Sequence, residues 1–503
     1  MLRRFYPRLR LRQKAPTSAA APRRSARVAP EWHHVVNARG ARRQTGYTLQ
    51  YDSAGPRHRG GTSRPARGGH MDMRESIHRM KLEAPAMAAS PLEQRNRALE
   101  LIVRALEANA QRIFAANEKD MASAAEAGVA QTVQKRLRYD EAKLRDGVEG
   151  LRQLQELPDP VGRVLLDREL DQGLELRRVT CPIGVIGVIF EARPDALVQI
   201  SSLCIKSGNC AVLKGGRETA NTNRVLFDVI HAVVVRAGLP AGCLLQAELH
   251  SEIDELLRCD EDVDLLIPRG SNKFVRYIMD HTKIPVMGHS AGVCHVFVDR
   301  DADQDMAVRV LVDAKTQYPA VCNAAETLLV DRAIAAEFLP KAARGLAERG
   351  ARLRGTAEVV DLLANAEGIP AVELMADDEF STEYGDYVMS CKVVDGVREA
   401  VDHINRYGSH HTDAIVTASD DAAEYFMQMV DSAGVYRNCS TRFADGFRYG
   451  FGAEVGISTG KLHARGPVGL DGLVTYKYRL VGHGDIVAPY ASGEKSFHYR
   501  ELG

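Results

Sequence analysis

One cysteine of the chain stands in a loop where a substrate could reach it. Cys322 lies in the run Tyr-Pro-Ala-Val-Cys-Asn-Ala-Ala-Glu-Thr (318–327), between a helical pattern that Pro319 ends and an apolar strand pattern. A thiolate in such a loop can attack an acyl carbonyl, and loop N–H groups can stabilise the oxyanion. Spacing alone barely separates Cys322 from Cys294 or Cys439, and burial as a small core residue is the commoner fate of a free cysteine.

The nine cysteines are scattered singly along the sequence. No Cys-x-x-Cys pair and no sequence cluster of cysteine with histidine occurs, so we expect neither a redox dithiol nor a zinc site, and no metal. An odd number of scattered cysteines fits a reducing compartment, and we expect a cytoplasmic protein.

Two glycine-containing turns each follow a strand pattern and open a helical one. The first is Lys214-Gly215-Gly216-Arg-Glu218, and the second is Pro-Arg-Gly-Ser-Asn-Lys (268–273). Glycine lets the backbone approach a phosphate closely, and a lysine can reach a phosphate or a ribose. Neither turn has the G-x-G-x-x-G spacing, so ordinary βα turns are an equally good interpretation.

Arginines mark two further places where an anion could bind. Arg193 follows the buried strand pattern at 185–190, where its planar guanidinium could hold a carboxylate or phosphate, or pair structurally with Glu191. Residues 438–469 are dense in Gly, Ser, Thr and Arg with little periodicity, which favours a long functional loop. Arg442 and Arg465 in this loop suit an anionic substrate. His463 could act as an acid or base, although a lone histidine is more often a structural hydrogen-bonding group.

The elements that must position these residues alternate between strand and helix. Helical spacing covers residues 91–121 and 132–157. Strands at 185–190, 211–214, 244–247 and 263–267 then alternate with helices at 196–207, 219–237, 253–257 and 272–281. A second set, with strands at 293–298 and 327–330 and helices at 306–316 and 332–347, surrounds Cys322. This order predicts doubly wound parallel sheets, which bind ligands beyond the carboxyl ends of their strands.

We therefore expect four parts. Residues 1–70 form a basic extension, residues 71–300 without 160–180 but with 459–470 a cofactor-binding domain, and residues 301–458 a catalytic domain. The hairpin pattern at 160–180 and the terminal segment 471–503 form an oligomerisation element, which predicts a homo-oligomer, a dimer or a tetramer.

The formal net charge of zero hides an asymmetry. Residues 1–70 hold fifteen arginines and one lysine against Glu31 and Asp52, and the rest of the chain is acidic. An acidic body gives no electrostatic footprint for nucleic acid. No run approaches the roughly 18 apolar residues of a membrane helix, so we expect no membrane partner. The basic segment could be a disordered tail, a transit peptide, or sequence upstream of a true start at Met71 or Met73.

Several long motifs in order make the sequence resemble the gamma-glutamyl phosphate reductases, a branch of the aldehyde dehydrogenase superfamily. The resemblance covers about residues 71–490. The motifs are PIGVIGVIFEARPD (182–195), GVCHVFVD (292–299), YPAVCNAAETLLV (318–330), YGSHHTDAIVT (407–417), STRFADG (440–446) and GAEVGISTGKLHARGPVGL (452–470).

This resemblance implies a reaction and a mechanism. L-Glutamyl 5-phosphate and NADPH would give L-glutamate 5-semialdehyde, phosphate and NADP⁺, the second step of proline biosynthesis. Cys322 matches the family nucleophile, which displaces phosphate to form a thioester that then accepts hydride. Glutamate 5-kinase is implied as a channelling partner.

The resemblance also implies roles for other residues. Lys214 corresponds to a lysine near the cofactor ribose, Gly270-Ser271 to the turn over the pyrophosphate, and Glu383 to the glutamate on the nicotinamide ribose. The implied cofactor-binding residues are Lys214, Gly215, Gly216, Glu218, Gly270, Ser271 and Glu383, and the implied substrate-binding residues are Arg193, Asn323, Arg442 and Arg465.

Arg193 stands where hydrolytic aldehyde dehydrogenases carry an oxyanion-binding asparagine, which disfavours simple aldehyde oxidation. Two alternatives stay open: a dehydrogenase that oxidises a small semialdehyde, and a non-catalytic protein on the same fold. The sequence also departs from the reductase pattern in two places. Residues 288–291 lack an expected acidic residue before Gly292, and residues 385–387 are unusual after Glu383.

Overall fold

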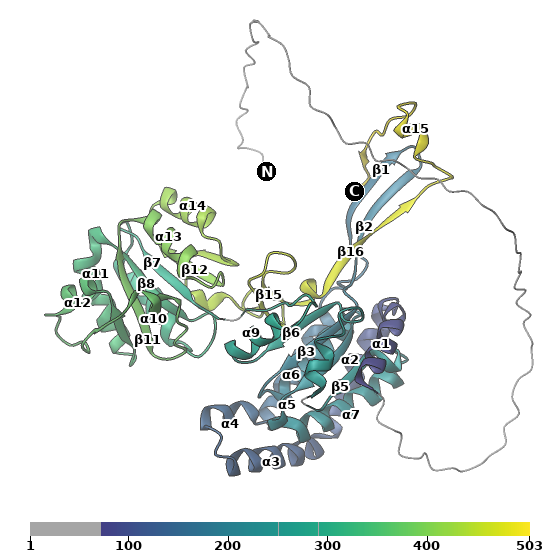
Figure 1. Cartoon of the computed structure of the whole chain (residues 1–503), viewed down its shortest axis with the longest axis horizontal. Coiled ribbons are helices and arrows are strands. Elements are labelled where there is room, and N and C mark those ends of the chain that lie inside the picture. The colour runs from purple at the N-terminus through teal and green to yellow at the C-terminus, as the bar shows by residue number, and fades with distance from the viewer. Residues whose placement is uncertain (1–71, 250, 290) are drawn as a thin grey trace, which may run out of the picture. The chain divides into compact units, whose positions relative to one another are not determined.

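The computed structural model describes residues 72–249, 251–289 and 291–503, most of which form two α/β regions, each built on its own parallel sheet (Figure 1). The basic segment at residues 1–70 lies outside the described residues. Among the helices that are described, none is both long and apolar enough to cross a bilayer.

Five helices precede the first sheet, more than the periodicity predicted. They are α1 (Met73–Ala88), α2 (Leu92–Ala108), α3 (Ala110–Glu126), α4 (Gln131–Leu137) and α5 (Glu141–Glu156). The helix expected over 91–121 is broken at Asn109, whose amide Nδ2 donates to the Ala105 carbonyl and ends α2. The helix expected over 132–157 is broken before Asp140, whose carboxylate accepts from Lys143 N and starts α5.

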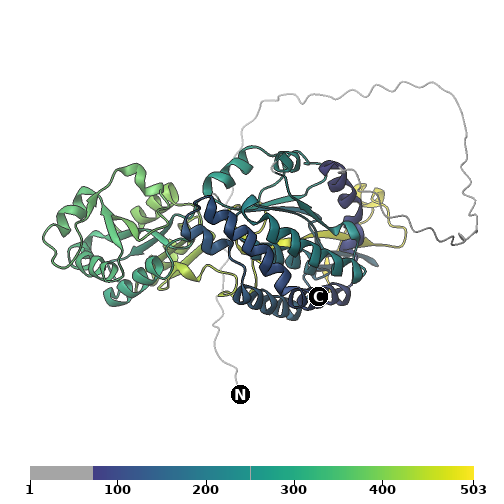
Figure 2. The same ribbon diagram turned by 90° about the horizontal axis from the view of Figure 1, so that it is seen from below.

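The first sheet has the strand order β5-β4-β3-β6, with every pair parallel. Its strands are β3 (Val185–Phe190), β4 (Cys210–Gly215), β5 (Leu244–Ala247) and β6 (Leu265–Arg269). Its helices are α6 (Pro194–Lys206), α7 (Ala220–Arg236), α8 (Ser251–Leu256) and α9 (Asn272–Asp280). Every residue of β3 is buried, as expected for a strand covered on both faces. Figure 2 shows the early helices, purple to blue, packed along this teal region, with which they share one core.

The second sheet has seven parallel strands in the order β10-β9-β11-β8-β7-β12-β13. They are β7 (Cys294–Val298), β8 (Ala325–Asp331), β9 (Arg352–Gly355), β10 (Glu373–Leu374), β11 (Val388–Val394), β12 (Thr412–Val416) and β13 (Gly434–Arg437). Its helices are α10 (Gln304–Thr316), α11 (Arg332–Ala347), α12 (Ala357–Leu363), α13 (Val397–Tyr407) and α14 (Asp420–Met429). Strand β7 precedes residue 300, where we expected the domain boundary, yet its pairing places it in this second sheet.

A third, antiparallel sheet has the order β16-β2-β1-β17. It joins the expected hairpin, β1 (Val164–Asp171) and β2 (Leu174–Pro182), to the terminal strands β16 (Val474–Val481) and β17 (Arg500–Glu501). The short helix α15 (Ala488–Ala491) lies between those two strands in sequence. Strands β14 (Gly456–Ser458) and β15 (Gly466–Val468) pair within the long loop. Val455 and Val468 of that loop, and Leu470 directly after it, join the core of the first region.

Candidate active site

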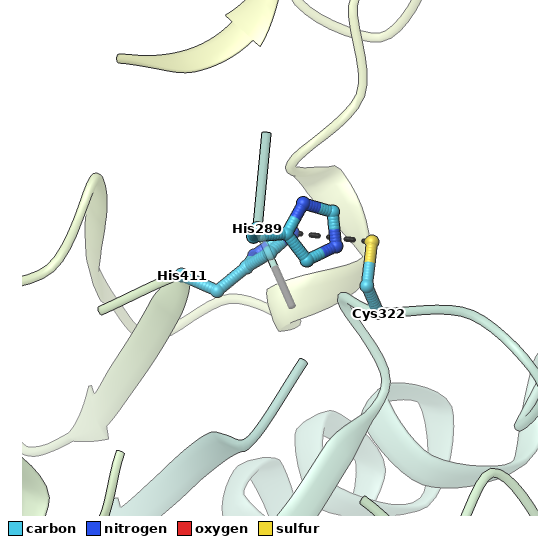
Figure 3. A group of neighbouring side chains, drawn as sticks. All are labelled: His289, Cys322 and His411. Carbon is cyan, nitrogen blue, oxygen red and sulfur yellow. Dashed lines mark hydrogen bonds between the residues drawn. The ribbon is translucent and has the colours of Figure 1, made fainter. Parts of the chain in front are cut away.

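Cys322 faces an imidazole across a hydrogen-bond distance. Its Sγ lies 3.2 Å from Nε2 of His411 (Figure 3). The thiol is half-buried and His411 is buried. On the other side of the ring, Nδ1 lies 3.0 Å from the Thr412 hydroxyl. A neutral His411 can therefore donate from Nδ1 to that hydroxyl and keep Nε2 free to accept the thiol proton.

Sheet order explains why residues so far apart in sequence meet. Cys322 shortly precedes β8, His411 immediately precedes β12, and Gly292 shortly precedes β7. These strands are neighbours in the order β8-β7-β12, and all three are parallel, so their amino ends lie at one edge of the sheet. The nucleophile candidate is thus at the amino edge, opposite to the carboxyl edge that a doubly wound sheet suggests.

The backbone of Cys322 is held closely by the start of β7. A Cβ added to Gly292 would lie 2.2 Å from the Cys322 carbonyl oxygen and 2.3 Å from its Cα. The Cys294 thiol donates to the same carbonyl oxygen at 3.2 Å. Burial raises the pKa of the Cys294 thiol, which keeps it protonated as a donor. Cys294 therefore supports the loop, while Cys322 presents its sulfur.

His289 is the third polar side chain beside the sulfur (Figure 3). Its Nδ1 lies 2.9 Å from the Ile457 carbonyl oxygen. A carbonyl only accepts, so Nδ1 carries the proton and the second ring nitrogen holds a free lone pair. Burial lowers the pKa of His289, which keeps the imidazole neutral near pH 7. The rings of His289 and His411 meet edge to face at 5.0 Å between centroids.

A cavity of about 700 Å³ opens beside Cys322. Most of the residues singled out from the sequence line it. They are Cys322, Asn323, Arg193, Arg442, Glu218, Gly270, Ser271 and Glu383. The cavity also borders His289, Arg269 and Glu454, which the sequence did not single out.

Five of the singled-out residues do not line this cavity, namely Lys214, Gly215, Gly216, Arg465 and His463. Lys214 is buried and its ammonium donates to the Gly215 carbonyl at 2.6 Å. Gly216 packs so closely on Glu218 that an added Cβ would lie 2.0 Å from Glu218 Oε1. Arg465 donates to the Asp431 carboxylate at 3.1 Å.

The turn that follows β6 is joined to the loop that carries Glu383 by a hydrogen bond at the start of α9. Asn272 Nδ2 donates to the Glu383 carboxylate at 2.6 Å. Ser271 N donates to the Glu191 carboxylate at 3.0 Å. Behind Glu383, the backbone N–H of Gly385 donates to Glu326 of β8. Strand β8 therefore follows the loop that carries Cys322 and also holds the loop that carries Glu383, through Glu326.

Glu326 also forms a fully buried pair with Lys315, at 2.6 Å between the ammonium and the carboxylate. Burial raises the pKa of Glu326 to about 7 and lowers the pKa of Lys315, because a charge on either group loses its hydration. The pair connects α10 to β8 on either side of the Cys322 loop, so it holds the two flanks of that loop together.

Arginines bring positive charge to the cavity. Arg269 is partly buried; its pKa is lowered first by this burial and then by the nearby Arg193 guanidinium. Arg442 is buried, and its pKa is lowered by burial and by Arg448. Its Nε donates to the Gln317 side chain at 2.9 Å. Arg269 thus lies near Arg193, and Arg442 near Arg448. Two neighbouring guanidinium groups repel each other, and an anion that binds between them is stabilised by both.

Asn323 is placed by the long loop. Its Nδ2 donates to the Ala444 carbonyl at 2.8 Å, and its own carbonyl accepts from the Thr441 hydroxyl at 2.7 Å. Its buried Oδ1 has no hydrogen-bond partner among the described residues. The segment 440–446 is therefore fastened directly to the residue that follows the nucleophile.

Comparison with known proteins identifies the family. Residues 50–351 match the Aldehyde dehydrogenase family. A gamma-glutamyl phosphate reductase of Pelotomaculum thermopropionicum is 54% identical over 432 residues, which are 86% of this chain and 98% of the relative. The chain belongs to the gamma-glutamyl phosphate reductases of this family. The reductase of Acetivibrio thermocellus is 51% identical over 86% of this chain and 99% of its own.

Solved structures agree with this assignment. The crystal structure of a gamma-glutamyl phosphate reductase from Thermotoga maritima has a TM-score of 0.80 and 35% identity, over 82% of this chain and 99% of that chain. An acetylating aldehyde dehydrogenase from Geobacillus thermoglucosidasius, 16% identical with a TM-score of 0.57 over 82% of this chain and 97% of that chain, shares the fold. The family and fold expected from the motifs are confirmed. The protein is an oxidoreductase of a family that uses a nicotinamide cofactor.

Sequence reasoning about this reductase missed His411, His289 and Arg269. His411 lies inside the motif YGSHHTDAIVT, and a histidine directly before a strand was the available signal. His289 lies in the stretch noted only for lacking an acidic residue. Arg269 is in the second glycine-containing turn, directly before Gly270 and Ser271. His411 therefore lies inside a motif and Arg269 adjoins Gly270, whereas His289 lies three residues before the motif at 292–299.

Proposed function

We propose that this enzyme reduces L-glutamyl 5-phosphate to L-glutamate 5-semialdehyde and phosphate with NADPH, the second step of proline biosynthesis. The observation that carries the proposal is the Cys322 sulfur, which borders a 700 Å³ cavity and lies 3.2 Å from the His411 imidazole. The names of the relatives suggest gamma-glutamyl phosphate as the substrate and reduction as the direction of the reaction. The site supplies a nucleophile, a proton acceptor and cations for an acyl phosphate.

In the proposed reaction, His411 Nε2 accepts the thiol proton and the Cys322 thiolate attacks the acyl carbon. The C–S bond forms, the C–O bond to phosphate breaks, and inorganic phosphate leaves with its electron pair and takes up one proton from solvent. A thioester is more electrophilic than a carboxylate and accepts hydride. The tetrahedral oxyanion that results breaks its C–S bond to give the aldehyde, and the thiolate that leaves takes back the proton held on His411.

The arginines would hold the phosphate. Arg193, Arg269 and Arg442 all border the cavity that Cys322 faces. A guanidinium is charged at every physiological pH and binds phosphate oxygens by two parallel hydrogen bonds. Phosphate leaves more easily when its developing charge is already neutralised, so these side chains favour the step in which the C–O bond breaks.

The residues present fit a nicotinamide cofactor. Gly270 and Ser271 follow β6 and directly precede α9, where a helix amino end and a close backbone favour a pyrophosphate. The Glu383 carboxylate borders the same cavity and can accept from a ribose hydroxyl. Lys214 and Glu218, the two further cofactor-binding candidates, lie at the carboxyl end of β4 and the turn after it. The cofactor, when bound, supplies the hydride.

The reverse reaction gives the most direct test. Purified enzyme is assayed with glutamate semialdehyde and NADP⁺, with and without phosphate, and NADPH formation is followed by absorbance. We expect turnover only with phosphate, because the thioester has phosphate as its acceptor. Turnover that is equal without phosphate would show a hydrolytic dehydrogenase instead. The same assay with NAD⁺ decides the cofactor preference.

The role of Cys322 is tested by Cys322→Ala. We expect this variant to lose turnover completely and to bind NADPH as the wild type does, because the thiol takes no part in holding the cofactor. The matched control is Cys439→Ala, at another half-buried cysteine, which should keep turnover. Full phosphate-dependent turnover by Cys322→Ala would refute the mechanism.

Two expectations concern partners, the first from the proposed function and the second from the exposed strands. An acyl phosphate hydrolyses in water, so its supply by glutamate 5-kinase at close range would limit the loss. The exposed β16 strand and the β1–β2 hairpin favour a homo-oligomer.

A further inference from the structure

Cys322, His411 and His289 bring three metal-binding atoms together. Each residue offers one ligand atom, and these three atoms all lie within 4.8 Å of one another. The three come from the segments before β8, β12 and β7, so the sheet itself holds them in register. In Figure 3 both imidazoles lie beside the Cys322 sulfur. A thiolate with two imidazoles is a donor set that zinc prefers.

The hydrogen bonds behind each imidazole suit metal binding. In His289 the Nδ1–H is fixed on the Ile457 carbonyl, so Nε2 is the nitrogen with the free lone pair. In His411 the Nδ1 lies against the Thr412 hydroxyl, and Nε2 faces the sulfur. Histidines that bind metals almost always donate their other ring N–H to such a partner, which fixes the ring and raises its basicity. Both rings already have this arrangement.

Distances favour a tetrahedral ion. With Zn–S of about 2.3 Å and Zn–N of about 2.0–2.1 Å, tetrahedral geometry places the ligand atoms roughly 3.3–3.6 Å apart. The Cys322 sulfur and His411 Nε2 are 3.2 Å apart. The nitrogen of His289, within 4.8 Å of each, needs only a small movement. The cavity beside Cys322 leaves the fourth position open to water or a substrate oxygen.

We propose that Cys322, His411 and His289 form a three-ligand site for Zn²⁺ whose occupation reversibly inhibits the enzyme. The metal site stands on the geometry alone, whereas the inhibition rests on the proposed function, since it requires Cys322 as the nucleophile. A sulfur bound to zinc is not free to attack an acyl carbon. Semialdehyde or acyl phosphate must then compete with the ion for the same sulfur.

Metal binding here exchanges a proton and involves no electron transfer. The S–H bond breaks, the S–Zn bond forms, and one proton passes to solvent. Hard cations such as Mg²⁺ and Ca²⁺ prefer oxygen ligands and should neither bind here nor inhibit.

Cobalt substitution gives a readout that does not depend on turnover. Co²⁺ is added to the full-length enzyme, and the absorption spectrum is recorded with Zn²⁺ as competitor. We expect a near-ultraviolet sulfur-to-cobalt charge-transfer band that Zn²⁺ abolishes. The band should vanish in Cys322→Ala and persist in Cys181→Ala, the control at another half-buried cysteine. No band, or a band that survives in Cys322→Ala, overturns the site.

His289→Gln tests the third ligand. We expect its Zn²⁺ dissociation constant, measured by competition with Co²⁺, to rise about 10- to 100-fold, the range seen even when a supporting partner is lost. The matched control is His231→Gln on α7, whose ring nitrogen likewise bonds a backbone carbonyl, that of Ala241. Equal zinc affinity in His289→Gln and His231→Gln overturns the three-ligand site.

Inhibition is measured separately in the phosphate-dependent assay, each variant against its own uninhibited rate. We expect Zn²⁺ at micromolar concentration to inhibit, and a chelator to restore the rate. A cobalt band without inhibition would keep the metal site and refute Cys322 as the nucleophile. The two failures are thus distinguishable.

Discussion

His411 distinguishes Cys322 from the eight other thiols of the chain. Among the cysteines that the structure describes, burial raises the pKa of several thiols, Cys391 by burial alone and Cys204 by burial with a smaller contribution from Cys243. Those thiols stay protonated and unreactive. Cys322 instead has an imidazole nitrogen at 3.2 Å and a cavity in front of it. A nucleophilic thiol needs a group that accepts its proton and a cavity through which the substrate reaches it, and Cys322 has both.

Replacement of His411 tests the proton transfer. We expect His411→Asn to lower kcat by about 10²–10⁴-fold, the usual contribution of a general base. The rate of the variant should rise with pH, as solvent hydroxide takes over deprotonation, while the KM for NADPH stays close to that of the wild type. The control His410→Asn removes the neighbouring imidazole, whose Nδ1 bonds the Asp431 carbonyl. An unchanged pH profile in His411→Asn would exclude the base role.

Arg269 carries the prediction about phosphate. A hydrogen bond to a charged group contributes about 1.5–3 kcal/mol, so Arg269→Gln should raise the KM for phosphate in the reverse reaction by roughly 10- to 100-fold. The KM for NADP⁺ should change far less. Arg236→Gln on α7 serves as the control. If Arg269→Gln affected the two constants equally, Arg269 would be a general structural support.

At the scale of elements, the sequence gives the strands but not their order. The strands around Cys322 were predicted, because a run of apolar β-branched residues between helical patterns signals a buried strand. The contact between Cys322 and His411 joins residues 89 positions apart. It exists because β8, β7 and β12 are neighbours, and periodicity carries no information on which strands are neighbours. The same limit hid His289, whereas the loop position of Cys322 is local and was predicted.

The aromatic cluster around His403 of α13 predicts that the folded state loses stability in acid. His403 packs between Phe380, Tyr407 and His295, and neither of its ring nitrogens has a partner among the described residues. Burial, with His295 and Lys392, lowers the pKa of His403 to about 2. Below about pH 6.5 the unfolded chain therefore takes up a proton that the folded chain does not. Stability from this group is complete above that pH and falls as the pH decreases.

His403→Phe keeps an aromatic ring in this cluster and removes the titration. One pKa unit corresponds to about 1.4 kcal/mol, so from pH 7 to pH 5 the wild type should lose about 2 kcal/mol more unfolding free energy than the variant. Urea unfolding at the two pH values measures the difference. Equal losses in both proteins would show that the folded state protonates His403.

At the scale of the whole molecule, β16 is an edge strand that displays apolar side chains. Tyr476, Tyr478 and Leu480 alternate onto one face and are about half exposed or more. An exposed apolar edge is a template for pairing with another chain.

We therefore expect the wild type to be a dimer or larger in light scattering after gel filtration. The double variant Tyr478→Arg, Leu480→Arg should shift towards the monomer, because charges at a sheet edge oppose pairing. Leu82→Arg, at an exposed apolar residue of α1, is the control and should keep the assembly. If the wild type were a monomer at micromolar concentration, β16 would not be an oligomer contact.

Gly292 has a consequence for experiments that need the enzyme stopped before chemistry. No side chain fits at this position, because the added atom would meet the backbone of Cys322 itself. Gly292→Ala would thus push the nucleophile loop aside while every reacting group stays in the chain. Such a variant could hold an intact acyl phosphate beside a thiol too distant to attack it, and so allow the substrate complex to be crystallised.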